Sequence, residues 1–214
     1  LDDIFNDPDF EWPTVWEDLN DGMQITSFYR LGLSLSNPGA TLAGAQDNST
    51  FIFDGTNWIT AFGGDGMEAL IQPNDPLHLY GSSQFGRIVR STDGGYTYET
   101  ISQQMRNDPN ELSAWTTPFM MEPGDPGVLY AGYSNLWKST DDGLNWAKIS
   151  NFPYMPNTSF GAPASALAIS PSDPRAIYMA RRIYHSFGQP SEMWRTFDGG
   201  TTWTDVTAGL PDSL

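Results

Sequence analysis

Three short segments of the chain place a hydroxyl, a carboxylate and a glycine in the same order, at residues 91–98, 139–146 and 196–203. Such aspartates could act as acids, bases or metal ligands. Hydroxyl and carboxylate groups also stabilise tight turns by bonding nearby backbone groups, and glycine supplies the positive φ that such turns need. Because turn chemistry already gives each of these residues a role, we predict structural turns and no catalytic residue.

A large aromatic residue closes each of these segments, where it can cover the hairpin and fill space between neighbouring repeats. We predict that the turns and their closing rings are built from Ser91, Asp93, Gly95, Tyr98, Ser139, Asp141, Gly143, Trp146, Thr196, Asp198, Gly200 and Trp203.

Two polar clusters lie outside these segments, at Gln46-Asp47-Asn48 and at residues 63–68. Both flank the same part of the chain, so they could meet. Asp47, Asp65 and Glu68 then offer oxygen ligands for Ca²⁺, or hydrogen-bonding groups for a glycan. Asp-Asn and Gly-Asp-Gly are also ordinary turn sequences, and we favour that interpretation, with no cofactor and no metal.

Four aromatic residues lie in or beside the longer connections and could stack on sugar rings. These are Trp115, Tyr154, Phe187 and Trp194. Most of the eight tryptophans are expected in the core. The candidate ligand-binding residues are therefore Gln46, Asp47, Asp65, Glu68 and Trp115.

The elements that position these residues repeat along the chain. The aspartates of the three turns are 48 (141 − 93) and 57 (198 − 141) residues apart. A Pro-x-Asp-Pro segment precedes each turn, with apolar runs before and after it, so each period holds four strand-like runs separated by turn residues. Four strands per period is typical of a β-propeller blade, and very little helix is expected.

We therefore predict an all-β fold, a β-propeller segment of about four four-stranded antiparallel blades. The blades are assigned to residues 25–66, 67–117, 118–165 and 166–210 of one domain, 1–214. The first blade is a weaker copy without the Asp-Gly turn. Trp16 resembles the closing aromatic of each repeat, so residues 1–24 are interpreted as the closing strand of a preceding blade.

Composition limits the classes of function. The formal net charge of −16 would repel a phosphate backbone, which excludes nucleic acid as a partner. There is no cysteine, and two histidines are too few for a His-rich zinc site. No apolar run approaches the roughly 20 residues that cross a bilayer. The first residues lack the basic start of a signal peptide, so the chain is interpreted as a mature or excised segment.

The pattern Ser-x-Asp-x-Gly followed by Trp or Tyr resembles the Asp-box, or BNR, repeats of sialidases, VPS10/sortilin-type propellers and xyloglucan-hydrolysing propellers. Residues 16–30, 44–48, 63–68 and 115–119 are similar to large secreted proteins of gliding bacteria, which often carry a C-terminal type 9 secretion signal. No such signal is visible here. The resemblance implies a secreted or cell-surface location.

The enzyme families make different demands on the residues. Xyloglucanases are expected to place a catalytic acid where Gln84 stands here, and an amide cannot act as general acid or base at neutral pH. Sialidases need an arginine cluster, whereas Arg90 and Arg195 recur as repeat features. Sortilin-type propellers continue into a cysteine-rich module that this sequence does not contain.

We therefore predict a non-catalytic extracellular propeller that serves as a scaffold or recognises polysaccharide or protein. The alternative is a glycoside hydrolase of the xyloglucanase or sialidase type whose acids lie partly outside this segment. The expected partners are a polysaccharide or protein and the remaining blades of a larger propeller or an adjoining domain.

Overall fold

The computed structural model describes residues 26–153, 162–182 and 191–208. These residues form four antiparallel four-stranded sheets, each made of strands that follow one another in sequence. The only helical elements among them are the 3₁₀ turn η1 (Gln84–Gly86) and the one-turn helix α2 (Gln103–Arg106). The prediction of an all-β fold with four four-stranded blades is confirmed. The assignment of residues 1–24 to a closing strand lies outside the described residues.

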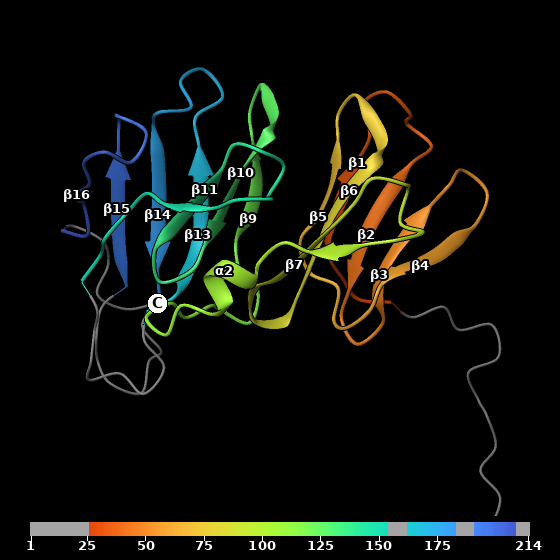
Figure 1. Cartoon of the computed structure of the whole chain (residues 1–214), viewed down its shortest axis with the longest axis horizontal. Helices are drawn as coiled ribbons and strands as arrows, with labels where there is room; N and C mark the ends of the chain where they lie inside the picture. The colour runs from red at the N-terminus through yellow and green to blue at the C-terminus, as the bar shows by residue number, and fades with distance from the viewer. Residues whose placement is uncertain (1–25, 154–161, 183–190, 209–214) are drawn as a thin grey trace, which may run out of the picture.

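The four sheets stand side by side in chain order (Figure 1). The first consists of β1 (Phe28–Leu33), β2 (Thr41–Ala45), β3 (Ser49–Phe53) and β4 (Trp58–Phe62). The second consists of β5 (Ala69–Gln72), β6 (Asp75–Ser83), β7 (Arg87–Ser91) and β8 (Glu99–Thr100). The third consists of β9 (Phe119–Glu122), β10 (Asp125–Gly132), β11 (Leu136–Ser139) and β12 (Ala147–Lys148). The fourth consists of β13 (Ala164–Ile169), β14 (Ile177–Arg181), β15 (Glu192–Thr196) and β16 (Thr204–Asp205).

Successive connections in an antiparallel sheet lie at alternate ends of the strands. The turns after the first and third strands therefore share one end, which we call the turn end. The connections after the second strands and those between sheets share the other, which we call the connection end. Helix α2 lies at the connection end, at the bottom of Figure 1.

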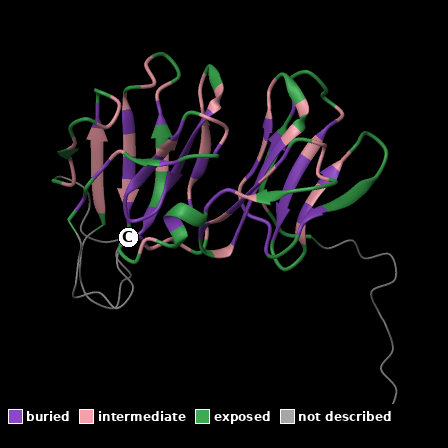
Figure 2. Ribbon diagram, viewed as in Figure 1, coloured by how far each residue is buried: buried purple, intermediate pink, exposed green. Residues whose placement is uncertain are grey.

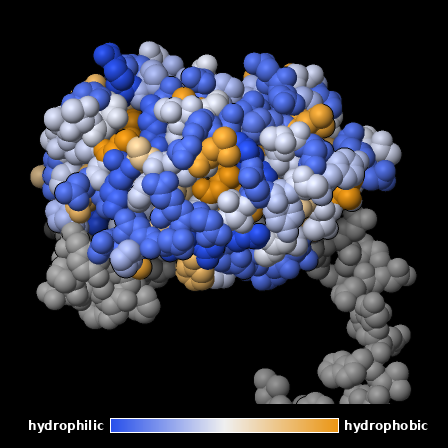
Figure 3. Space-filling view, viewed as in Figure 1, coloured by the Kyte–Doolittle hydropathy of each residue, from blue (hydrophilic) through white to orange (hydrophobic). Residues whose placement is uncertain are grey.

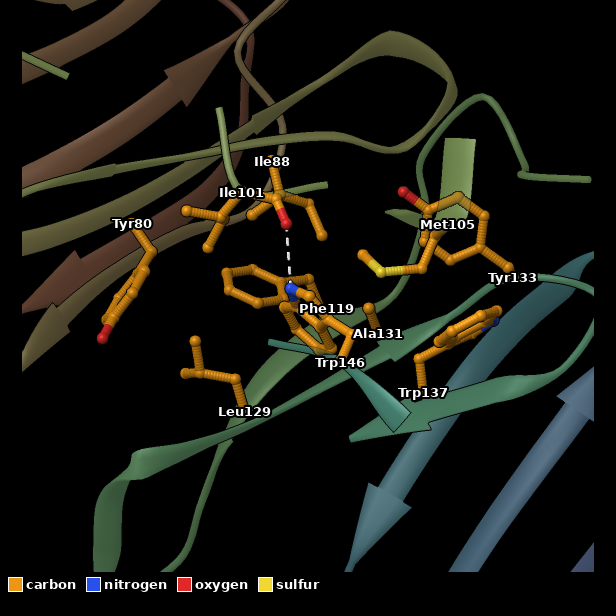
Figure 4. Packing of buried hydrophobic residues seen from close by; sticks show 10 residues of the cluster. All are labelled: Tyr80, Ile88, Ile101, Met105, Phe119, Leu129, Ala131, Tyr133, Trp137 and Trp146. Carbon is orange, nitrogen blue, oxygen red and sulfur yellow. Dashed lines mark hydrogen bonds between the residues drawn. The ribbon is translucent and has the colours of Figure 1, made fainter. Parts of the chain in front are cut away.

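The core lies between the sheets, where the strands are most deeply buried (Figure 2). Three apolar clusters fill the three gaps between successive sheets. The cluster between the second and third sheets surrounds Trp146, with Tyr80 and Ile88 from one sheet and Leu129 and Ala131 from the other (Figure 4). Because neighbouring sheets bury each other's faces, each sheet depends on the next for its apolar contacts.

The surface in the view of Figure 3 is largely hydrophilic, with small apolar patches, as the high net charge leads one to expect. Within the described ranges, no helix has the length and apolar character needed to cross a membrane.

Candidate functional site

The three turns predicted from the sequence share one hydrogen-bond network. In the first, the Ser91 hydroxyl donates to the Asp93 carboxylate (2.8 Å) and accepts from the Gly95 N–H (2.8 Å). The same carboxylate accepts the backbone N–H (2.9 Å) and the hydroxyl (2.6 Å) of Thr97. We call this turn and its two counterparts the Asp-Gly turns.

The contacts recur at 2.6–3.0 Å in the other two Asp-Gly turns, through Ser139, Asp141, Gly143 and Asn145, and through Thr196, Asp198, Gly200 and Thr202. Each carboxylate is occupied by donors of its own turn, and the three turns belong to three different sheets. Asp93, Asp141 and Asp198 therefore do not surround a common pocket.

These hydrogen bonds stabilise the ionised carboxylates. The side chain and then the backbone of Thr97 hold the pKa of Asp93 at about 2. The side chain and backbone of Thr202 act in the same way on Asp198, whose pKa is also about 2, and Asn145 lowers the pKa of Asp141. A carboxylate with such a low pKa is a poor general acid or base near neutral pH.

The closing aromatic of an Asp-Gly turn contacts the preceding sheet. The indole Nε1 of Trp146 donates to the carbonyl of Ile101 (2.8 Å), and that of Trp203 donates to the carbonyl of Ile149 (2.9 Å). Tyr98 packs edge-on against Phe62, with 5.5 Å between ring centroids. These rings join successive sheets.

The two polar clusters of the first blade meet at the connection end, beside the second sheet. The Asp47 N–H donates to Oδ1 of Asp65 (2.7 Å), while Nε2 of Gln84 donates to Oδ2 of the same carboxylate (2.6 Å). The Asp65 N–H returns a hydrogen bond to Oε1 of Gln84 (3.2 Å). Asp65 is buried, so both of its oxygens are engaged by protein donors.

The other two residues of the 46–48 cluster make local turn contacts. The Gln46 N–H donates to the carbonyl of Ser27 (2.8 Å), and the Asn48 amide donates to the carbonyl of Gln46 (2.9 Å). The Gln46 side chain is exposed.

Glu68 directly precedes β5 and forms an ion pair with Arg30 of β1 (3.4 Å). Burial raises the pKa of Glu68 above its usual value, and the charge of Arg30 opposes that rise. The ion pair connects the inner strands of the first two sheets.

Calcium binding by Asp47, Asp65 and Glu68 stays a prediction. No group of three or more His, Cys, Asp or Glu side chains in the described part of the chain is placed to hold a metal ion. Each Asp65 oxygen accepts one hydrogen bond from a protein donor, and Glu68 forms an ion pair with Arg30.

An aromatic cluster lies beside the Asp65–Gln84 pair. The rings of Trp115 and Phe85 meet edge-on with centroids 5.2 Å apart, and the Trp115 indole donates to the Tyr29 hydroxyl (3.4 Å). Trp115 and Phe85 are 40% and 55% exposed. Phe85 adopts φ 56° and ψ 46°, a left-handed conformation that is strained for a bulky residue, and strained residues cluster at functional sites.

A buried polar network holds the connection that carries Trp115. Glu111 accepts the backbone N–H (3.0 Å) and the side-chain amide (2.8 Å) of Asn135, and it forms an ion pair with Lys148 (2.8 Å). The Leu112 N–H donates to the Ser134 hydroxyl (3.0 Å). The connection is thus fastened to the third sheet just before Trp115.

The sequence interpretation did not include Tyr29 and Phe85 among the candidate binding residues. Phe85 directly follows Gln84, and this adjacency is the signal by which the sequence could have identified it. Tyr29 lies in an inner strand, and the sequence gives no comparable signal for it. Of the other proposed stacking residues, Trp194 packs on Phe152, with centroids 4.8 Å apart. Tyr154 and Phe187 lie outside the described residues.

No family model matches the chain. The chain is 29% identical to a xyloglucanase of Paenibacillus sp over 166 residues, which is 66% of this chain and 16% of that enzyme. It is 27% identical to a xyloglucanase of Acetivibrio thermocellus over 178 residues, or 70% of this chain and 20% of that enzyme. The chain therefore spans about a fifth or less of the length of these relatives.

Solved structures show the same fold. The chain resembles an ancestral GH74 enzyme with a TM-score of 0.64 and 16% identity, covering 88% of this chain and 27% of the enzyme. It resembles the GH74 xyloglucanase of Xanthomonas campestris with a TM-score of 0.62 and 19% identity, covering 84% and 30%. The chain is thus a segment of a β-propeller similar to those of glycoside hydrolases.

Proposed function

We propose that this chain is a segment of a secreted or cell-surface, glycoside-hydrolase-like propeller, and that the segment binds a polysaccharide of the xyloglucan type without hydrolysing it. The observation that carries the proposal is the pairing of Asp65 with Gln84 beside the exposed Trp115 and Phe85.

The aromatic cluster supports polysaccharide binding. Sugar rings stack on exposed aromatic faces, and nearby polar groups fix their orientation by hydrogen bonds. Trp115 and Phe85 supply the rings, and Tyr29 adds a hydroxyl. The exposed side chain of Gln46 and the backbone of Asp47 lie on the neighbouring loop, which meets Asp65. The names of the similar enzymes point to xyloglucan as the polymer.

The Gln84 amide supports a binding segment rather than a catalytic one. Gln84 occupies the position at which the xyloglucanase resemblance implies an acid, and an amide exchanges no proton near neutral pH. The nearest carboxylate, Asp65, accepts hydrogen bonds on both oxygens and is buried. Gln84 therefore cannot protonate a leaving group, and both Asp65 oxygens are held by the Asp47 backbone and the Gln84 amide.

A second candidate function is hydrolysis with one acid supplied by this chain and the other by the rest of a longer protein. The observation that favours it is Glu68, whose pKa is raised by burial, as a general acid requires. The Arg30 ion pair opposes this role, because a neighbouring cation favours the ionised form.

Binding to xyloglucan oligosaccharides, measured by isothermal titration calorimetry, tests the proposal. We expect Trp115→Ala to weaken binding about tenfold or more, which corresponds to about 1.4 kcal/mol. The matched control is Tyr96→Ala, because Tyr96 is 85% exposed in an Asp-Gly turn at the opposite end of the sheets. Equal affinities of the two variants, or no binding by the unmodified chain, would refute the proposal.

Hydrolysis is tested separately by release of reducing sugar from β-glucans and of sialic acid from sialosides. We expect no turnover by the unmodified chain. Turnover that disappears in Glu68→Gln or Asp65→Asn would establish the second candidate function instead.

The finer parts of the proposal rest on resemblance. We assign the Asp-Gly turns to the Asp-box class because three equivalent networks recur at the predicted positions. The blade boundaries are supported by strands that fall within 25–66, 67–117 and 118–165, while the first strand of the last blade begins at Ala164, two residues before its predicted start. VPS10-like character and type 9 secretion of a parent protein are proposed on resemblance alone.

A further inference from the structure

The contact between successive sheets follows a rule that can be stated in residue offsets. The residue after each closing aromatic pairs with the third strand: Glu99 with Arg90, Ala147 with Lys138, and Thr204 with Arg195. In the first sheet, Ile59 pairs with Ile52 in the same way. Trp58 therefore occupies the place of the closing aromatic in the first sheet, although that sheet has no Asp-Gly turn.

A glycine three residues before each closing aromatic meets the preceding sheet. A Cβ on Gly95 would lie 3.2 Å from Cβ of Ala61, and one on Gly200 would lie 3.1 Å from Cβ of Ile149. A Cβ on Gly143 would clash with Cδ1 of Ile101. The contacted residues are Ala61, Ile101 and Ile149. Each of them lies three residues after the closing aromatic of its own sheet.

The same offsets place Gly55 three residues before Trp58. Its φ of 99° matches the values of 93°, 86° and 97° at the three glycines that contact a preceding sheet. A Cβ on Gly55, however, would meet none of the described residues within 4 Å. The first sheet thus has the same backbone conformation at this glycine, but no described residue packs against it.

Two leucines on the same face of the first sheet are exposed. Leu31 and Leu33 alternate with Gly32, which lies against the backbone of Ala69 in the second sheet, so the two leucines face the other way. They are 59% and 63% exposed, whereas Ile71, which the second sheet presents to the first, is 2% exposed. We call the face formed by Leu31, Leu33, Gly55 and Trp58 the acceptor face.

We propose that residues 15–19 of this chain bind to the acceptor face, in the position that the outer strand of a preceding sheet would take. The offsets select these residues: Trp16 has the position of a closing aromatic, and Leu19 lies three residues later. The proposal predicts a contact between Leu19 and Gly55 and a hydrogen bond from the Trp58 indole to the Leu19 carbonyl, by analogy with the bond from Trp146 to Ile101 (Figure 4). An aliphatic residue at this offset is shared with Ala61, Ile101 and Ile149.

An engineered disulfide tests the pairing in the whole chain, which contains no cysteine of its own. The test pair is Leu19→Cys with Gly55→Cys. The positive control is Ala61→Cys with Gly95→Cys, whose Cβ atoms are 3.2 Å apart, close to the separation in a disulfide. The negative control is Leu19→Cys with Gly124→Cys, because Gly124 also has positive φ (89°) and open space around it.

We expect the test pair to cross-link to the extent of the positive control on a non-reducing gel, and the negative control to remain reduced. Absence of the cross-link in the test pair, with the positive control oxidised, would overturn the proposal. Equal cross-linking of the test pair and the negative control would overturn it as well, because contact would then be unspecific.

A second measurement does not depend on oxidation. Thiol labelling of Gly55→Cys is expected to become about tenfold faster or more when Leu19→Asp is added, since a charged side chain cannot remain buried on the acceptor face. Labelling of Gly124→Cys is expected to stay unchanged by Leu19→Asp. An unchanged labelling rate at Gly55→Cys would contradict the proposal even if the cysteine pair failed to fold.

Discussion

The indole of Trp146 donates a 2.8 Å hydrogen bond to the carbonyl of Ile101, across the gap between the third sheet and the second (Figure 4). One side chain thereby fills the core between two sheets and satisfies a buried backbone group at the end of an outer strand. The same relationship between Trp203 and Ile149 shows that it is a property of the repeat.

The first prediction concerns this hydrogen bond. Trp146→Phe keeps an aromatic ring but leaves the Ile101 carbonyl without its donor, so we expect a loss of about 1–3 kcal/mol in the free energy of unfolding. Urea denaturation measures it. Tyr96→Phe is the control, because Tyr96 is 85% exposed and should change stability little. A loss as small as that of the control would show that the hydrogen bond contributes nothing.

The second prediction concerns acid. The folded-state pKa of Asp93 is about 2, below the ordinary value of 3.8, because Thr97 and Ser91 donate to the carboxylate. A lowered folded pKa means that the contribution to stability is complete above pH 3.8 and is lost as the pH falls through about 2. Carboxyl resonances followed by NMR should give this pKa directly. In Asp93→Asn the free energy of unfolding should depend less on pH in that window than in the unmodified chain.

The third prediction separates backbone strain from packing at the turns. Gly200 and Gly124 both have positive φ, so an alanine at either position is strained by roughly 1–2 kcal/mol. A Cβ at Gly200 would also lie 2.8 Å from the Ile149 carbonyl oxygen, whereas one at Gly124 meets nothing within 4 Å. We expect Gly200→Ala to destabilise the chain by about 1–3 kcal/mol more than Gly124→Ala. Equal losses in thermal or urea unfolding would show that strain alone accounts for the glycine.

The sequence predicted the repeating parts of the fold well, because each repeat shows the same turn residues. The same turn residues recur around Asp93, Asp141 and Asp198, and the apolar runs beside them indicate the strands. The first sheet was predicted from weaker signals, since the span from Phe53 to Trp58 is 5 residues (58 − 53) whereas that from Ser91 to Tyr98 is 7 (98 − 91). The shorter turn still keeps a glycine of positive φ at Gly55.

The contacts at the connection end could be predicted only in part. The sequence places the clusters around Asp47 and Asp65 beside the same blade, but the hydrogen bond between Asp65 and Gln84 joins two loops that do not repeat. The conformation of Phe85 has no counterpart in sequence either, because a left-handed backbone at a bulky residue arises from tertiary contacts. The repeat pattern of the sequence therefore predicts the sheets, whereas the candidate site around Asp65 and Gln84 depends on contacts between loops.

The last prediction tests how the Asp65–Gln84 pair is held. Gln84→Glu replaces a donor 2.6 Å from the Asp65 carboxylate with a second carboxylate, in a site where Asp65 is buried. Two such groups cannot both ionise without strong repulsion, so the pair should take up a proton at a raised pKa. A raised folded-state pKa of an acid lowers stability at high pH, and the loss recovers as the pH falls through that pKa. We therefore expect Gln84→Glu to be destabilised by about 1–3 kcal/mol at pH 7 and to approach the stability of the unmodified chain near pH 4, as measured by urea denaturation.

Gln46→Glu is the control, because Gln46 is exposed and its substitution should give no such dependence of stability on pH. If Gln84→Glu were as stable as the control at pH 7, the amide would have no role in holding Asp65, and the loop that carries Phe85 would have to be fixed by other contacts.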